Sequence, residues 1–187
     1  MAKYYLDIET LGLDPKVDKI ITIQYQELDR NSGKAIGPLV ILKEWELTER
    51  EMLLKFIRDC KIGSVDKFDF IPVGYNLGFE HNFLKERTLR NDVRQLDILG
   101  MPFIDLHALG ILMNNGEFKG SGLDKLTGKA MSGRLIPEWY GAKEYDKIRD
   151  YIVNETESFL EFHAWLCREM PSCLERFKNE HSANWKK

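Results

Sequence analysis

The sequence has few cysteines and no long apolar run, and each absence excludes a class of protein. No run of apolar residues approaches the roughly 20 that a transmembrane helix needs, so we expect no membrane association. The N-terminus lacks a basic stretch followed by a small-residue cleavage site, so we expect no secretory signal. The three cysteines, Cys60, Cys167 and Cys173, show no C-x-x-C spacing. They favour reduced thiols in a cytoplasmic protein over a zinc site or a disulfide framework.

The sequence also lacks an excess of positive charge. A formal net charge of −3 argues against a broad basic face that coats nucleic acid non-specifically. It leaves open an enzyme that takes a nucleic-acid end into a local cleft, where metal ions neutralise acidic ligands. The chain has 187 residues, of which 43% are hydrophobic and 30% charged. These values predict one globular domain over residues 1–187.

Apolar periodicity along the chain predicts an α/β fold. Strands are expected over 3–8, 20–28, 39–43, 70–75 and 102–105, with the second and third forming an antiparallel hairpin. Helices are expected after Thr48, from Gly78, up to Met113, over 123–130 and over 143–170. The order of three strands, a helix, a strand, a helix, a strand and further helices predicts a mixed β-sheet with helices on both faces.

Two local signals set helix ends in this prediction. Glu51 follows Thr48 by three residues, which is the spacing of a capping box at a helix start. Pro171 is expected to stop the last helix, because proline lacks the N–H that a helix interior needs.

Four carboxylates and a tyrosine stand out along the chain as candidate site residues. Asp7 and Glu9 are two positions apart on the first strand, so both point to the same face. Two adjacent acids repel one another unless a cation lies between them. Glu80 falls in the first turn of the helix after the fourth strand, near a strand end, where open α/β sheets bind ligands. Tyr151 and Glu155 are four residues apart on the last helix and share one face.

The chemistry of these groups predicts a metal site. Each group alone has an ordinary explanation, such as a solvated strand end or a helix surface pair, but the ordered set favours a shared role. Oxygen ligands without Cys or His suit Mg²⁺ or Mn²⁺ rather than zinc. Four negative charges match two divalent ions, which clamp an in-line displacement at phosphorus when about 3.5–4 Å apart. One ion would activate a water and the other would hold the leaving oxygen, with Tyr151 orienting the water.

The motifs around these residues resemble the three exonuclease motifs of the DEDD superfamily. They read D-I-E-T-L-G-L-D from Asp7, N-L-G-F-E-x-x-F-L from Asn76 and Y-x-x-x-E from Tyr151. The resemblance implies a ribonuclease H-like fold and a two-metal 3′→5′ exonuclease that acts on single-stranded or frayed ends of DNA or RNA. The tyrosine four positions before Glu155 is similar to the tyrosine subclass, which includes the proofreading domains of DNA polymerases. The histidine subclass would need histidine at the position of Asp150.

The same resemblance implies roles for four further residues. Thr10 and Leu13 would contact the terminal nucleotide, with Leu13 as an apolar wedge against the last base. Asn76 and Phe79 would line the path of the substrate strand. Apolar and stacking contacts of this kind are indifferent to base sequence.

The sequence departs from the family pattern at Glu80 and Glu155, where the family usually has Asp. Each Glu adds one methylene, on the order of 1.5 Å of reach, and a misplacement of about 1 Å can cost roughly a hundredfold in rate. Two alternatives stay open, and these Glu residues suggest the first of them. One is a catalytically weak or inactive nucleic-acid-binding or interaction module of the same fold. The other is a ribonuclease H-type endonuclease. The sequence does not reveal whether a protein partner in DNA or RNA processing exists.

Overall fold

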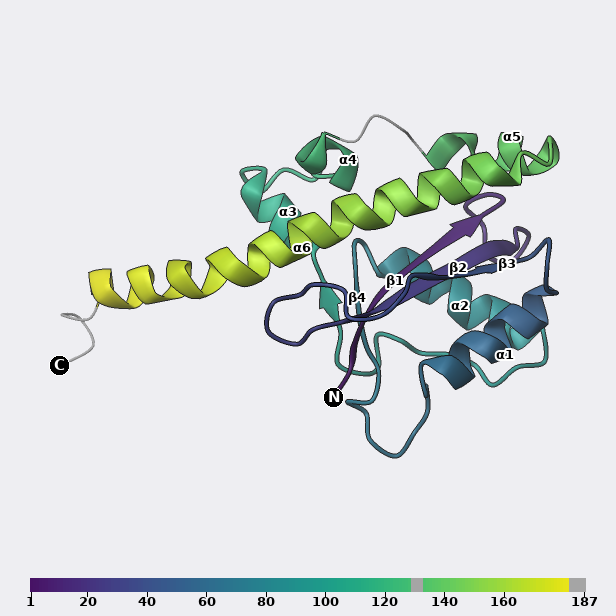
Figure 1. Cartoon of the computed structure of the whole chain (residues 1–187), viewed down its shortest axis with the longest axis horizontal. Coiled ribbons are helices and arrows are strands. Elements are labelled where there is room, and N and C mark those ends of the chain that lie inside the picture. Colours follow the sequence, from purple (N-terminus) through teal and green to yellow (C-terminus); the bar gives the residue numbers. More distant parts are fainter. Residues whose placement is uncertain (129–132, 182–187) are drawn as a thin grey trace.

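The computed structural model describes residues 1–128 and 133–181, and within these a mixed sheet forms the centre of the molecule (Figure 1). The strands are β1 (Lys3–Thr10), β2 (Ile20–Leu28), β3 (Val40–Lys43), β4 (Ile71–Gly74) and β5 (Ile104–Asp105). Their order across the sheet is β3-β2-β1-β4-β5. β2 is antiparallel to β1 and β3, whereas β1, β4 and β5 are parallel. The predicted mixed sheet and its antiparallel hairpin are confirmed.

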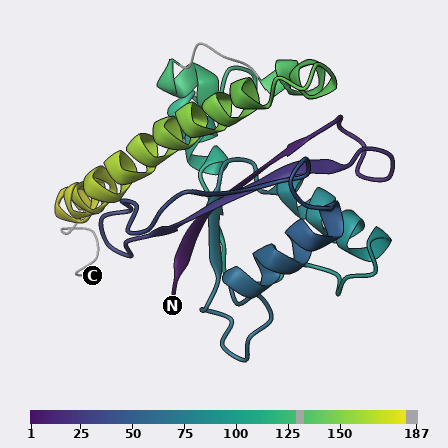
Figure 2. The same ribbon diagram turned by 45° about the vertical axis from the view of Figure 1, so that its right-hand side comes forward.

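Helices cover both faces of this sheet (Figures 1 and 2). On one face lie α1 (Glu49–Asp59) and α2 (Gly78–Arg90). On the other lie α3 (His107–Met113), α4 (Leu123–Thr127), α5 (Ile136–Gly141), which follows the 3₁₀ turn η1 (Gly133–Leu135), and the long α6 (Tyr145–His181). Within the described parts of the chain, no helix combines the length and the apolar character needed to cross a membrane. The three cysteines are free thiols, as predicted.

Side-chain alternation along β1 separates one core from the candidate site. Leu6 points into the core that α1 and α2 form against the sheet. Tyr5 points to the opposite face and packs against Phe159 of α6, with the ring centroids 4.8 Å apart. Asp7 and Glu9 follow Tyr5 at intervals of two and therefore share its face. The two acids consequently lie on the side of the sheet that α6 covers.

The last helix is longer than the sequence predicts. α6 continues through Pro171 to His181 instead of ending before the proline. Proline in a helix interior costs about 3 kcal/mol or more, because it removes one hydrogen bond and crowds a carbonyl. Good helix formers follow it, and Lys178 pairs with Glu175 at 2.7 Å one turn from the helix end. These local terms favour continuation of the helix beyond the interruption.

Two other helix ends follow capping chemistry. The predicted capping box is present at the start of α1, where Thr48 accepts from the Glu51 N–H and the Glu51 side chain accepts from the Thr48 N–H. α4 ends at Thr127, earlier than expected, because Gly128 adopts a left-handed backbone with φ of 71°. Ala130, the predicted end of this helix, lies outside the described residues.

Candidate functional site

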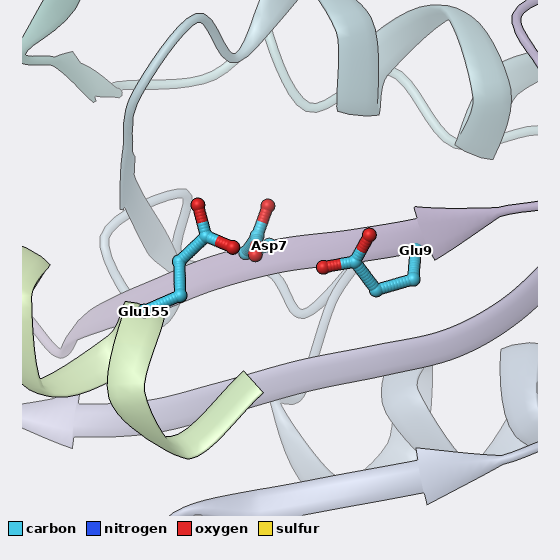
Figure 3. Close-up of side chains that lie close together, drawn as sticks. All are labelled: Asp7, Glu9 and Glu155. Atoms are coloured by element: carbon cyan, nitrogen blue, oxygen red, sulfur yellow. The ribbon is translucent and has the colours of Figure 1, made fainter. Parts of the chain in front are cut away.

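Three of the four predicted carboxylates meet between β1 and α6. Asp7, Glu9 and Glu155 each offer one oxygen, and these oxygens lie within 4.8 Å of one another. Figure 3 shows the Glu155 side chain extending from α6 toward Asp7, and the Glu9 carboxylate turned along β1 toward the same place. All three side chains are half-buried. We refer to these three residues as the carboxylate cluster; its donor set consists of hard oxygens, which suit Mg²⁺ or Mn²⁺.

Glu80 is beside Asp7 but outside the carboxylate cluster. It lies in the first turn of α2, as predicted, and only 4% of it is exposed. Burial and then the neighbouring Asp7 charge raise the pKa of Glu80 well above its ordinary range, because both disfavour the ionised form. Glu80 Oε2 is buried and has no hydrogen-bond partner among the described residues. A buried oxygen in this state is a group that a cation can satisfy.

Tyr151 lies against the carboxylate cluster, one helical turn before Glu155. Its hydroxyl hydrogen-bonds with the Glu155 side chain. Burial, followed by the charges of Glu9 and Glu155, raises the pKa of Tyr151, so the hydroxyl keeps its proton at neutral pH. Gly133 approaches closely: a Cβ added there would lie 3.1 Å from the Tyr151 hydroxyl and 3.8 Å from Glu9 Oε2. A larger residue at this position would crowd the hydroxyl.

Asp7 is held by a buried polar chain that the sequence analysis did not identify. Gln24 is directly opposite Asp7 in the β1–β2 register, and its Nε2 donates to Asp7 Oδ2 over 2.8 Å. Thr22 Oγ1 in turn donates to Gln24 Oε1 over 3.0 Å, and both residues are fully buried. The Tyr5 hydroxyl donates to the same Asp7 oxygen over 3.3 Å. One feature of the sequence points to this polar chain. Thr22 and Gln24 alternate with isoleucines in a strand that helices are expected to cover on both faces, so both polar side chains would be buried and would need hydrogen-bond partners.

Asp105, at the end of β5, fixes the turn that precedes Glu80. Its carboxylate accepts the backbone N–H groups of Asn76 at 2.8 Å, Leu77 at 3.0 Å and His107 at 3.0 Å. Asn76 has a φ of 65°, which is uncommon for a residue other than glycine. The first two hydrogen bonds hold this turn and therefore set where α2 begins and where Glu80 lies, whereas the third holds the start of α3.

The four residues expected to contact the substrate do not share one cavity. Asn76 lines a cavity of about 770 Å³ that also borders the carboxylate cluster. Leu13 and Phe79 line a different groove of about 300 Å³, and Leu13 is 84% exposed. The Thr10 hydroxyl turns to its own loop and donates to the Gly12 carbonyl over 2.6 Å. Leu13 and Phe79 thus line one groove together, whereas Asn76 lines the cavity beside the carboxylate cluster.

Comparison with known proteins identifies the fold. No family model matches the sequence, and no curated protein matches it. The zinc-bound form of the E. coli exonuclease I complex with single-stranded DNA has a TM-score of 0.58 and 12% identity, covering 94% of this chain and 42% of that one. An exonuclease I complex with SSB-Ct has a TM-score of 0.50 and 15% identity, covering 72% of this chain and 38% of that one.

The fold is ribonuclease H-like. This confirms the fold that the sequence motifs imply. At such low identities the likeness concerns the fold alone, and the chain spans less than half the length of these exonucleases.

Proposed function

We propose that the chain is a metal-dependent 3′→5′ exonuclease of the tyrosine subclass, which hydrolyses phosphodiester bonds at single-stranded or frayed nucleic-acid ends. The observation that carries the proposal is the meeting of Asp7, Glu9 and Glu155 oxygens within 4.8 Å of one another. Tyr151, buried beside them and bonded to Glu155, adds a protonated hydroxyl at the same place. The solved complex of E. coli exonuclease I with single-stranded DNA supports a single-stranded substrate for this fold.

The donor set fits two divalent ions, Mg²⁺ or Mn²⁺. Asp7, Glu9 and Glu155 would hold them, and Glu80 would supply a fourth carboxylate through its buried oxygen, which has no hydrogen-bond partner among the described residues. When bound, such ions lower the pKa of a water and neutralise charge that develops on the phosphate. Because the raised pKa of Glu80 favours its protonated form, metal binding would release this proton.

The chain's own residues would position the reacting groups. Tyr151 would hold the attacking water through its hydroxyl, whose orientation the hydrogen bond to Glu155 restricts. The hydrogen bond from Gln24 engages Asp7 Oδ2 and fixes the rotation of the carboxylate. Leu13, which is exposed and lines a groove with Phe79, would contact the terminal base. Thr10, the last residue of β1, would contact the terminal nucleotide as well.

The alternative function is nucleic-acid binding without turnover. One observation favours it: Glu80 is buried beside Asp7 but lies outside the carboxylate cluster. If this carboxylate stays protonated when metal is present, the site lacks one of its four charges, and hydrolysis would be weak or absent.

A polarity assay distinguishes these functions. Single strands of DNA and RNA, labelled at the 3′ or the 5′ end, are incubated with Mg²⁺ or Mn²⁺ alongside a circular strand. We expect immediate release of the 3′ label as a mononucleotide, stepwise shortening of 5′-labelled strands, and an intact circle. The Asp7→Ala variant should lose activity, while the Glu27→Ala control, an exposed acid on β2, should keep it.

The contrary outcomes point to the rival functions. Cleavage of the circle would indicate a ribonuclease H-type endonuclease. Binding without cleavage under either metal would indicate the non-catalytic module. Full activity in Asp7→Ala would refute the assignment of the site.

A further inference from the structure

The cavity that borders the carboxylate cluster has an aromatic wall. Its volume is about 770 Å³, and its lining includes Tyr75, His107 and Phe118 in addition to Asp7 and Glu155. The Tyr75 and His107 rings have centroids 5.2 Å apart, and the His107 and Phe118 rings lie edge to face at 6.4 Å. The three rings therefore form one continuous group along the cavity.

Phe118 is the exposed member of this group. It belongs to the segment between α3 and α4 and is 74% exposed. The fold leaves an aromatic ring in water at the edge of a cavity, although burial of that ring would stabilise the protein. An exposed aromatic face beside a polar cleft is the form that stacking platforms for unpaired bases take.

The segment that carries Phe118 is held by hydrogen bonds. Ser121, which is fully buried, donates from Oγ to the Phe118 carbonyl over 2.7 Å and lies 3.0 Å from His107 Nε2. The Tyr75 hydroxyl donates to the Ser121 carbonyl. Asn114 Nδ2 donates to two further carbonyls of the segment, at 2.7 and 3.0 Å. Phe118 is thus presented from a braced loop, which lowers the entropy lost when a ligand stacks on it.

The charge near this wall suits a nucleic-acid backbone. Lys125 lines the same cavity, and 71% of its side chain is exposed. Its ion pair with Asp124 is long, at 3.8 Å, and lies at the surface, where such pairs contribute little. The ammonium can therefore turn to a phosphate at small cost. Arg134 lines the cavity as well, so the wall carries cations next to an acidic centre.

We propose that Phe118 stacks on an unpaired base of the substrate strand, internal to the nucleotide that is removed, and that Lys125 contacts a phosphate of that strand. The inference rests on the proposed nuclease function and deepens it, because it adds a base-stacking contact and a dependence on strand length to the single-stranded substrate. A paired base is already stacked on its neighbours and offers no free face to the ring. The cavity would therefore select strands by their unpaired state and length, and be indifferent to base sequence.

The test of Phe118 is the dependence of binding on strand length. Fluorescence anisotropy gives the Kd of labelled single strands of two and ten nucleotides in Ca²⁺, which replaces Mg²⁺ to prevent turnover. In Phe118→Ala the advantage of the longer strand should fall by about 5- to 150-fold, the range expected from loss of one base–aromatic stack. Phe118→Trp should restore it. Phe68→Ala removes another exposed phenylalanine, in the segment between α1 and β4, and should leave the advantage unchanged.

The outcomes separate this inference from the function on which it rests. If the wild type cleaves and binds strands but Phe118→Ala keeps the full length advantage, only the stacking role is overturned. An equal loss in Phe68→Ala would also overturn it. If the wild type neither binds nor cleaves strands of any length, the proposed function and the inference both fail.

The test of Lys125 is the salt dependence of binding. Each phosphate contact to a single strand contributes a slope of about −0.7 in a plot of log affinity against log salt concentration. Lys125→Gln should reduce the slope by about this amount, whereas Lys67→Gln, an exposed lysine outside the cavity, should not change it. An unchanged slope in Lys125→Gln would remove Lys125 from the contact.

Discussion

Replacement of Gln24 by leucine tests whether the buried side chain behind Asp7 prepares that carboxylate for metal. Leucine is similar in size but lacks the N–H that donates to Asp7 Oδ2 over 2.8 Å. It also lacks the oxygen that accepts from Thr22 over 3.0 Å. Both polar residues are fully buried, so bulk water does not replace the lost bonds.

The magnitude follows from the kind of bond that is lost. A hydrogen bond to a charged acceptor contributes roughly 1.5–3 kcal/mol, which corresponds to about 10- to 150-fold in an equilibrium constant. Removal of a partner that orients a metal ligand costs about 10- to 100-fold in metal affinity. We therefore expect the Gln24→Leu protein to bind Mn²⁺ about 10- to 100-fold more weakly than the wild type. The Thr22 hydroxyl, left without its acceptor, should also lower the free energy of unfolding by about 1–3 kcal/mol.

Isothermal titration calorimetry with Mn²⁺ measures the affinity, and urea unfolding measures the stability. Gln26→Leu is the matched control: it lies two residues further along β2 and loses a 2.6 Å hydrogen bond to the Gly37 carbonyl, which is outside the carboxylate cluster. Its Mn²⁺ affinity should equal that of the wild type. An unchanged affinity in Gln24→Leu, or the same loss in both variants, would show that the Gln24 hydrogen bond does not prepare Asp7 for metal.

Two further predictions concern the neighbours of the carboxylate cluster. Tyr151→Phe removes the hydroxyl that hydrogen-bonds with Glu155. In single-turnover assays kcat should fall about 10- to 100-fold, with the melting temperature nearly unchanged. An unchanged kcat would exclude a role of Tyr151 in orienting the attacking water. Because burial and Asp7 raise the pKa of Glu80 in the folded state, its contribution to stability is fully present below the ordinary glutamate pKa and is lost as pH rises through the folded-state pKa. The melting temperature of the metal-free protein, measured with a chelator, should decline over that pH interval, and Glu80→Gln should remove the decline. Addition of Mg²⁺ or Mn²⁺ should raise the melting temperature of the wild type. A wild-type melting temperature that depends on neither pH nor metal would count against both the raised pKa of Glu80 and the metal site.

The parts of the site that depend on local periodicity could be predicted from the sequence. Asp7 and Glu9 share a face because strand side chains alternate, and Tyr151 contacts Glu155 because four residues make about one helical turn. Glu80 lies in the first turn of α2, as expected from the strand that ends just before this helix. These relations need only the type of element, which the apolar pattern reveals.

The parts that depend on register and packing could not be predicted. Gln24 faces Asp7 only because of the β1–β2 register, which includes an irregularity at the end of β1, and a shift by one residue would have turned Gln24 to the other face. Asp105 reaches the Asn76 N–H across 29 residues of sequence. Glu80 lies outside the carboxylate cluster because its place depends on how α2 packs, not on its position within the helix.

Anomalous diffraction from crystals soaked in Mn²⁺ would show whether the carboxylate cluster binds metal. We expect a manganese peak bounded by the Asp7, Glu9 and Glu155 oxygens, with a second peak on the side of Asp7 that faces Glu80. Both peaks should be absent in Asp7→Ala crystals soaked in the same way. Well-diffracting wild-type crystals with no peak between these carboxylates, or with manganese bound only elsewhere, would contradict metal binding by the carboxylate cluster.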